Sequence, residues 1–372
     1  MNLIILGTRP EIIKLYPLIN LFNKKKTSYK ILHTGQHYTK GLSEIFLRMF
    51  EIPKKKLHNL NIGSDSHGSQ TSLMMNGIEK FLKKNKIIDN VIVYGDTNSA
   101  LAGALVVSKL ENVILTHIEA GLRSFDKNMP EEINRRLIDH CSDILFCPTK
   151  ISKQYLIKEG LNKKKIFYVG NTIVDTIYSD KVTNSLNKAN HKKNQLVLTI
   201  HREENTKNTK NIKKLFQSVY KISKKYNLKV IFPIHPKTQR LIKSLIYNSD
   251  IIKIIDPLNY FDFLNLIAES KLVISDSGGV QEEACILKTP LITVRNSTER
   301  PETLMIGCNI LSKIRKNRIF KDAQIILNRK INWSNPYGDG KSSHKILNII
   351  NKIKKKKFQI LLKILLKQNF LF

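Results

Sequence analysis

The chain has 372 residues, of which 41% are hydrophobic, enough for two separate cores. Its formal net charge is +33, from 63 lysines and arginines against 30 acidic residues. The lysines occur in short runs among Asn and Ile, such as residues 24–26 and 163–165, without the interleaved aromatic side chains of a nucleic-acid-binding surface. We therefore expect no nucleic-acid partner and attribute the charge to a general bias toward Lys, Asn and Ile.

The beginning of the chain and its cysteines indicate a cellular location. The first residues run directly into a predicted strand, not into a secretory leader, and no apolar stretch reaches the roughly 20 residues of a membrane-spanning helix. The four cysteines follow no metal-ligand spacing. These features predict a cytoplasmic protein with no metal site and no stable membrane insertion.

Short apolar runs rich in β-branched residues alternate with helical stretches, which is typical of βαβ units and a parallel sheet. The first series of expected strands is 3–6, 29–33, 91–94, 113–117 and 144–147. The second series is 166–169, 196–200, 230–234, 251–255, 272–274 and 291–294. The pattern predicts the α/β fold class, with two doubly wound, Rossmann-like domains.

We expect the first domain at residues 1–172 and the second at 173–339, with a linker in the polar segment 178–194. A helix at about 340–352 should rejoin the first domain. The tail at 353–372 is basic and apolar at helical spacing. It fits either a helix lying on an anionic membrane surface or, as we prefer, a frayed chain end.

Polar residues follow the predicted strands. The segments in question are Gly7-Thr8-Arg9-Pro10, Gly35-Gln36-His37, Gly95-Asp96-Thr97-Asn98, 117–123, His201-Arg202 and His235-Pro236. Because open α/β sheets bind ligands outside the carboxyl ends of their strands, we expect these segments to form the binding site, in a cleft between the two domains.

The stretch from Ser275 to Ala284 follows a buried strand and turns helical after two glycines. The free N–H groups and positive dipole end of such a helix suit a phosphate, and glycine lets a ligand approach the backbone. We therefore predict that Ser277, Gly278 and Gly279 hold a diphosphate and that Glu283 binds a ribose. The alternative is an ordinary turn in which Ser277 caps the helix.

Three carboxylates and an imidazole suit proton transfer by a paired acid and base: Asp96, Glu119, Glu131 and His201. Three of them have a structural alternative: Asp96 could be a helix N-cap, Glu131 the partner of Arg135, and His201 a half-buried histidine. The sequence lacks a nucleophile elbow, a Gly-x-x-x-x-Gly-Lys loop and a Gly-x-Gly-x-x-Gly turn after the first strand. Redox chemistry with a bound dinucleotide is therefore disfavoured.

Taken in order, the motifs resemble those of the non-hydrolysing UDP-N-acetylglucosamine 2-epimerases, in register from about residue 1 to about residue 345. The segments that carry the resemblance are 7–14, 95–99, 117–126, 129–135, 201–202, 277–283 and 297–302. The resemblance implies a two-domain GT-B type fold and interconversion of UDP-N-acetylglucosamine and UDP-N-acetylmannosamine. It further implies elimination of UDP, an enzyme-held 2-acetamidoglucal, re-addition of UDP, no cofactor or metal, and a homodimer.

The resemblance also implies roles for individual residues. Asp96, Glu119 and Glu131 correspond to the acid/base carboxylates, and His201 to a histidine near the diphosphate. The substrate-binding positions are Arg9, Lys14, Leu258, Phe263, Ser277, Gly278, Gly279, Glu283 and Arg300. Of these, Leu258 and Phe263 fall where the family holds the uracil, and Arg300 where it binds the diphosphate.

Some features leave alternatives open. The segment Tyr38-Thr39-Lys40-Gly41 departs from the pattern with which some bacterial members bind a second substrate molecule as an activator. The Ser-Phe-Asp and Met-Pro-Glu-Glu segments are shared with epimerases of diacetamido-uronic acid nucleotides. A hydrolysing epimerase that releases UDP and free N-acetylmannosamine, and a glycosyltransferase of the GT-B type, also remain open.

Overall fold

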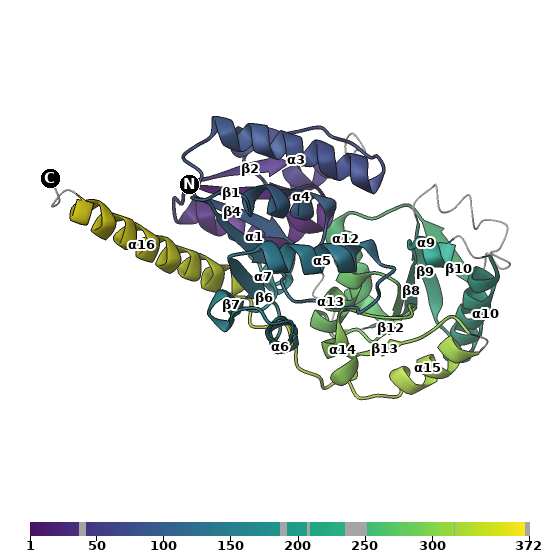
Figure 1. The fold of residues 1–372 in the computed structure, drawn as a ribbon. Helices are drawn as coiled ribbons and strands as arrows, with labels where there is room; N and C mark the ends of the chain where they lie inside the picture. Colours follow the sequence, from purple (N-terminus) through teal and green to yellow (C-terminus); the bar gives the residue numbers. More distant parts are fainter. Residues whose placement is uncertain (37–41, 187–191, 207–208, 235–250, 316, 369–372) are drawn as a thin grey trace. The chain divides into compact units, whose positions relative to one another are not determined.

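The computed structural model describes residues 1–36, 42–186, 192–206, 209–234, 251–315 and 317–368. The chain divides into two compact units. The first comprises Met1–Gly121, Ile133–Thr176 and Tyr337–Phe372, and the second comprises Leu122–Glu132 and Ile177–Pro336. Each unit contains a parallel β-sheet whose strands alternate with helices along the chain (Figure 1). The predicted α/β class with two Rossmann-like sheets is therefore confirmed.

The strand order of the first sheet is β3-β2-β1-β4-β5-β6-β7. Its strands are β1 (Asn2–Leu6), β2 (Tyr29–His33), β3 (Leu57–Asn59), β4 (Asn90–Tyr94), β5 (Ile114–Ile118), β6 (Ile144–Cys147) and β7 (Ile166–Tyr168). The order reverses between β1 and β4, which is the topological switch point where such sheets bind ligands. The sequence did not predict β3, which is three residues long and not fully buried.

The second sheet repeats this arrangement, with the order β10-β9-β8-β11-β12-β13. Its strands are β8 (Lys193–Thr199), β9 (Lys229–Pro233), β10 (Ile252–Ile255), β11 (Ser270–Ser275), β12 (Leu291–Thr293) and β13 (Asn309–Leu311). The switch point here lies between β8 and β11. The short strand β13 was not predicted either, and β8 begins inside the predicted linker.

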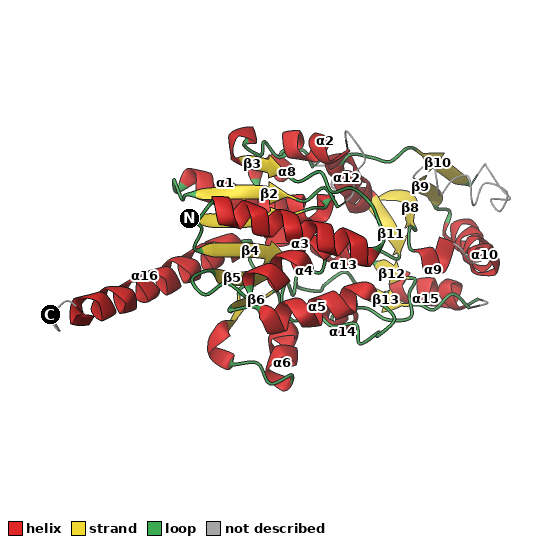
Figure 2. Ribbon diagram, turned by 45° about the horizontal axis from the view of Figure 1, so that its top comes forward, coloured by secondary structure: helices red, strands yellow, loops and turns green. Residues whose placement is uncertain are grey.

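Both sheets are covered by helices (Figure 2). In the first unit these are α1 (Arg9–Lys24), α2 (Leu42–Met49), α3 (His67–Lys84), α4 (Asn98–Val107), α5 (Pro130–Cys141), α6 (Lys150–Lys158), α7 (Thr172–Ile177) and α16 (Ser342–Gln368). In the second they are α8 (Asp180–Thr183), α9 (Glu203–Thr206), α10 (Thr209–Tyr226), α12 (Tyr260–Glu269), α13 (Gly278–Ile286), α14 (Pro301–Met305) and α15 (Arg318–Leu327). Helix α5 starts in the segment grouped with the second unit and ends in the first.

Successive side chains along each strand point to opposite faces of the second sheet. Leu196 and Leu198 of β8 pack against α10 and α15, whereas Val197 packs on the other face with α12 and α13. Both faces are apolar because helices cover both of them, which is why the strands of a parallel sheet read as continuous hydrophobic runs. The carboxyl edge of each sheet is therefore left to polar side chains.

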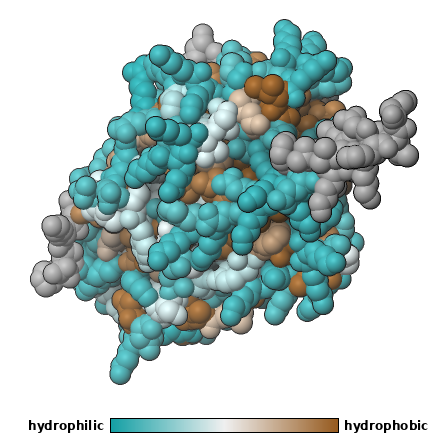
Figure 3. Space-filling model, turned by 90° about the vertical axis from the view of Figure 1, so that its left-hand side faces the viewer, coloured by the Kyte–Doolittle hydropathy of each residue, from teal (hydrophilic) through white to brown (hydrophobic). Residues whose placement is uncertain are grey.

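The sequence predicted a helix that ends near residue 352. Helix α16 instead continues to Gln368. Figure 1 shows its C-terminal half extending away from the sheet of the first unit. Within the described ranges no helix is long and apolar enough to cross a membrane. Hydrophilic residues cover most of the face seen in Figure 3, and the lysine runs at residues 24–26 and 163–165 are exposed.

Candidate functional site

At the switch point of the first sheet, a buried carboxylate joins the turns that follow β1 and β4. Glu11 accepts hydrogen bonds on Oε2 from the N–H groups of Gly7 (2.8 Å) and Thr8 (2.7 Å), and on Oε1 from the Thr97 hydroxyl (2.8 Å). Burial raises the pKa of Glu11 to about 7, although each of these hydrogen bonds lowers it. Glu11 thus fixes the two turns that carry Arg9 and Asp96.

Arg9 and Lys14 lie on α1 in different environments. Arg9 is exposed at the first position of the helix, where its guanidinium lies 5.7 Å from the ring centroid of Phe46. Lys14 is buried and pairs with the carboxylate of Glu119. Its Nζ atom also lies 5.6 Å from the ring centroid of Tyr94. One predicted substrate-binding residue is therefore the direct partner of a predicted catalytic one.

Asp96 follows β4 and pairs with Arg135 of α5. Its Oδ2 atom accepts hydrogen bonds from Arg135 Nε (2.9 Å) and Nη2 (2.6 Å). The N-cap of α4 is Thr97, whose Oγ1 accepts from the Ala100 N–H, so Asp96 is not the helix cap. The Asp96 side chain remains 29% exposed while Arg135 is buried. The two hydrogen bonds from the guanidinium fix the orientation of the Asp96 carboxylate.

Glu119 follows β5, the strand next to β4, and has a left-handed backbone with φ of 73°. Gly95 also has a positive φ of 64°, and a Cβ atom built on it would lie 3.1 Å from Oε2 of Glu119. The two turns therefore lie against each other, and glycine is required where they meet. The first unit thus places Lys14, Asp96 and Glu119 at the carboxyl edge of β1, β4 and β5.

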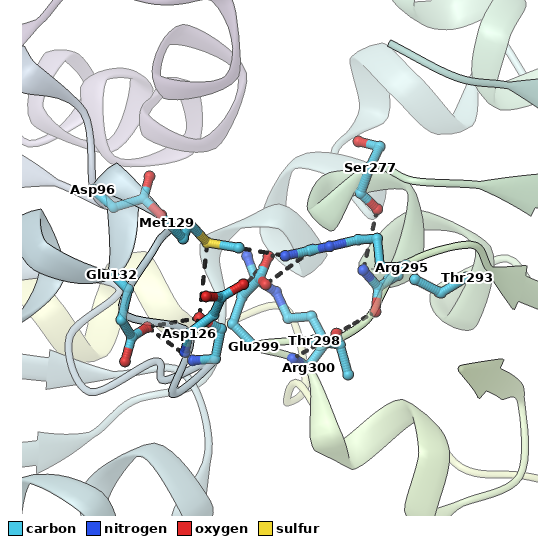
Figure 4. A network of polar contacts seen from close by, with 12 residues as sticks. Asp96, Asp126, Met129, Glu132, Ser277, Thr293, Arg295, Thr298, Glu299 and Arg300 are labelled. Carbon is cyan, nitrogen blue, oxygen red and sulfur yellow. Dashed lines mark hydrogen bonds and ion pairs between the residues drawn. The ribbon is translucent and has the colours of Figure 1, made fainter. Parts of the chain in front are cut away.

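Glu131 lies in the first turn of α5, in the segment Leu122–Glu132 that groups with the second unit. Its neighbour Glu132 is buried and accepts hydrogen bonds from the N–H of Ser124 (2.8 Å) and of Phe125 (3.2 Å), so Glu132 holds the segment's fold. The sulfur of Met129 lies 3.7 Å from the Ser124 hydroxyl. It also lies 3.9 Å from Nη2 of Arg295 (Figure 4).

At the switch point of the second sheet, Asp276 holds the segment that follows β8. It is fully buried and accepts hydrogen bonds from the N–H groups of His201 (3.2 Å) and Arg202 (3.0 Å) and from the amide of Asn205 (3.0 Å). His201 Nδ1 lies 3.0 Å from Oδ1 of Asp276. Burial acts to raise the pKa of Asp276, but His201, Asn205 and the Arg202 N–H together bring it below its usual value.

Asp276 therefore orients the imidazole of His201, whose side chain is 59% exposed. Sequence reasoning did not assign a catalytic or binding role to Asp276 or to Arg135, although Arg135 lies inside a motif that carried the family resemblance and Asp276 directly precedes one. Their partners are 75 and 39 positions away, and no local spacing indicates such pairs.

The predicted phosphate-binding residues lie at the start of α13. Ser277 is the N-cap, with its Oγ 3.5 Å from the Val280 nitrogen, as the alternative interpretation held. A Cβ atom on Gly278 would lie 2.6 Å from Oε1 of Glu299, so a larger residue here would displace the Glu299 carboxylate. Glu283 is buried beside Tyr260, and burial and this carboxylate raise the pKa of Tyr260 well above its usual value. Capping and anion binding are compatible, because the helix start carries several free N–H groups.

Arg300 is buried between two carboxylates. Its Nε lies 2.5 Å from Oε1 of Glu282 and its Nη1 lies 3.5 Å from Oε1 of Glu299. The neighbouring Arg295 pairs with the same Glu299, at 3.0 Å between Nη1 and Oε2 (Figure 4). The carboxyl edge of β12 thus carries two buried guanidinium groups held in place by acidic partners.

The predicted uracil-binding residues Leu258 and Phe263 lie after β10, both half-buried. Phe263 belongs to α12 and packs against the core formed by Val197, Val273 and Val280. His235 and residues 38–41, which the sequence analysis singled out, lie outside the described residues. In the part of the chain that the structure describes, no group of three or more His, Cys, Asp and Glu side chains is placed to bind a metal ion.

The chain is similar to known epimerases over nearly all of its length. The family model for UDP-N-acetylglucosamine 2-epimerase matches residues 20–351. The chain is 48% identical to the UDP-N-acetylglucosamine 2-epimerase of Methanocaldococcus jannaschii, over 93% of this chain and 98% of that protein. It is 38% identical to the UDP-2,3-diacetamido-2,3-dideoxy-D-glucuronate 2-epimerase of Pseudomonas aeruginosa, over 94% and 99%.

The fold is likewise similar to solved structures. The crystal structure of the M. jannaschii UDP-GlcNAc 2-epimerase in complex with UDP-GlcNAc and UDP matches with a TM-score of 0.84 and 47% identity, over 95% of this chain and all of that one. The Staphylococcus aureus MnaA–UDP co-structure matches with a TM-score of 0.84 and 32% identity, over 95% and 96%. The chain belongs to the UDP-N-acetylglucosamine 2-epimerase family.

Proposed function

We propose that this protein interconverts UDP-N-acetylglucosamine and UDP-N-acetylmannosamine without hydrolysing them. The observation that carries the proposal is 47% identity over the full length of a relative whose crystal structure contains UDP-GlcNAc and UDP. The carboxylates at the edge of the first sheet and the helix start at the edge of the second agree with it. The product would supply a sugar for surface polysaccharide synthesis.

The proposed reaction begins with an anti elimination. A carboxylate removes the proton from C2 of the sugar, the C2–H electron pair forms the C1=C2 double bond, and the C1–O bond breaks so that UDP leaves with its electrons. Asp96, Glu119 and Glu131 are the candidate acids and bases. Asp96 and Glu119 each lie beside a cationic side chain, Arg135 and Lys14 respectively, which holds the carboxylate in place.

The second half of the reaction reverses these steps on the other face. UDP attacks C1 of the 2-acetamidoglucal while an acid delivers a proton to C2 from the side opposite to the one that lost it. The developing charge on the leaving diphosphate is stabilised by the start of α13 and by Arg300 and His201. Glu283 binds the ribose, and Leu258 and Phe263 contact the uracil.

Incubation with UDP-N-acetylglucosamine in deuterated water tests the proposal. We expect both nucleotide sugars to acquire deuterium at C2 and to reach an equilibrium mixture, as followed by NMR. Accumulation of UDP and free N-acetylmannosamine would identify a hydrolysing enzyme instead. A sugar that stays unlabelled would exclude the elimination and favour a glycosyltransferase.

A second candidate substrate is the diacetamido-uronic acid nucleotide, because the P. aeruginosa relative that acts on it is 38% identical over 94% of this chain. The same C2 chemistry applies to both sugars, so substituents at C3 and C6 decide between them. Comparison of kcat/KM for the two nucleotides separates the candidates. We further propose that the protein is a homodimer and works in the cytoplasm. Light scattering of the purified protein tests the homodimer.

A further inference from the structure

The mechanism above does not use His117, a buried histidine of β5. Its Nδ1 lies 2.8 Å from Oδ1 of Asp139, and its Nε2 lies 2.8 Å from the carbonyl oxygen of Gly95. The His117 side chain is 1% exposed and that of Asp139 is fully buried. Both ring nitrogens therefore face an oxygen atom inside the first unit, away from solvent.

The two contacts require two protons. A carbonyl oxygen only accepts hydrogen bonds, so Nε2 must donate to Gly95. A neutral imidazole then has no proton left on Nδ1, and its lone pair would need a protonated Asp139 as the donor. Asp139 also accepts a hydrogen bond on Oδ2 from the N–H of Gly121 (3.2 Å), which suits its ionised form. The contacts are satisfied when the imidazole carries both protons and pairs with the Asp139 carboxylate.

The groups held by this pair belong to the turns that carry the candidate carboxylates. Gly95 immediately precedes Asp96, and Gly121 is two residues after Glu119. Both glycines have positive φ, 64° and 80°, so neither turn is held by ordinary strand geometry. Asp139 lies one helical turn after Arg135, the residue that binds Asp96. One ion pair therefore ties together β4, β5 and α5 behind the carboxylates.

We propose that His117 and Asp139 form a buried imidazolium–carboxylate pair that positions Asp96 and Glu119 for proton transfer, through the Gly95 carbonyl and the Gly121 amide. The two residues are positioning residues, since neither is argued to touch the substrate. The positioning role of the pair rests on the proposed function. The protonation of His117 does not depend on it.

The protonation is tested first, by NMR of enzyme labelled with ¹⁵N-histidine, near neutral pH and without substrate. The His117 ring signals are those that disappear in His117→Gln. We expect both ring nitrogens to bear protons. An Nδ1 resonance typical of a nitrogen with a free lone pair overturns the proposal. Because this readout needs no turnover, a chain without epimerase activity would refute the proposed function and leave this result standing.

The positioning role is tested by a series of variants. Asp139→Asn should lower kcat by about 100-fold, the loss typical of slightly misplaced catalytic groups, with UDP affinity unchanged. His117→Gln, whose amide can reach the Gly95 carbonyl from the place of Nε2, should keep more activity than His117→Asn, which can reach only Asp139. His140→Gln, at a 54% exposed histidine of the same helix, is the matched control and should behave as wild type.

Wild-type kcat in Asp139→Asn, or equal activity of the two His117 variants when both bind UDP normally, would overturn the positioning role. Thermal unfolding of each variant shows whether it is folded. Where one variant fails to fold, the positioning role is decided by the variants that do fold.

Discussion

Arg135 binds Asp96 through two nitrogen atoms, at 2.9 and 2.6 Å from the same carboxylate oxygen, although the residues are 39 positions apart. The pair joins α5 to the turn after β4. It also replaces the local pairing of Arg135 with Glu131 that the sequence suggested as the structural alternative. A candidate catalytic carboxylate is therefore held in place by a buried guanidinium while staying partly exposed.

Asp96→Asn and Glu131→Gln should each lower kcat by about 100- to 10,000-fold, the usual contribution of a general acid or base, while UDP affinity changes little. The carboxamides keep the shape of the side chains and remove their proton-transfer capacity, and Asp96→Asn also removes the charge that pairs with Arg135. Steady-state kinetics and calorimetric titration with UDP measure the two quantities. Glu79→Gln, at an exposed position of α3, is the matched control. Full turnover in either carboxamide variant would refute its assigned role.

Lys14 and Glu119 should show strong coupling in a double-mutant cycle. Removing either member leaves a buried charge without its partner, which typically costs about 3–5 kcal/mol of unfolding free energy. Lys14→Met combined with Glu119→Gln should cost less than the sum of the single changes. Urea unfolding of the four proteins measures the coupling. Strict additivity would show that the two side chains do not interact in solution.

Asp276→Asn should reduce turnover by about tenfold and weaken the attachment of the segment after β8, because the amide cannot accept the three donors as the carboxylate does. His201 would lose the charged partner that orients its ring. We expect kcat to fall together with the melting temperature. Asp339→Asn, at an exposed aspartate, is the control. Unchanged kinetics would show that His201 needs no such support.

Arg300→Ala should weaken UDP binding and also lower the stability of the second unit. The guanidinium is removed from the proposed diphosphate site, and Glu282 and Glu299 lose a buried partner. Titration with UDP and thermal unfolding with and without UDP distinguish the two effects. Arg48→Ala, at an exposed surface pair, is the control. A variant that is less stable but binds UDP normally would restrict Arg300 to a structural role.

The pH dependence of stability should carry a contribution from Glu11. Its pKa is raised from the ordinary 4.5 to about 7 in the folded protein, so the unfolded chain loses this proton first. Stability from this group is complete below the unfolded pKa and is lost as pH rises toward 7, by about 1.4 kcal/mol per pH unit at most. The difference in unfolding free energy between wild type and Glu11→Gln should fall over this window and stay level above it. Parallel curves would contradict the shift.

The sequence by itself determined the strands and the type of fold. The buried runs at 3–6, 29–33, 144–147 and 272–274 are apolar because helices cover both faces of a parallel sheet, so composition alone indicates them. The helix start at Ser277–Gly278 could also be predicted, because the capping residue and the glycine that follows it are adjacent in the sequence. Strands β3 and β13 were missed because three-residue strands carry too short a pattern to detect.

Only the tertiary structure decided which charges meet. The pairs Lys14–Glu119, Arg135–Asp96, His117–Asp139 and His201–Asp276 join residues from different elements, and no spacing in the chain distinguishes them from other possible pairs. Burial then strengthens the need for these pairs, because an unpaired charge removed from water costs free energy. A buried charge with a partner is held in one position. The residue types at the strand ends can therefore be read from the sequence, whereas their partners and their protonation follow from the packing of the sheet edges.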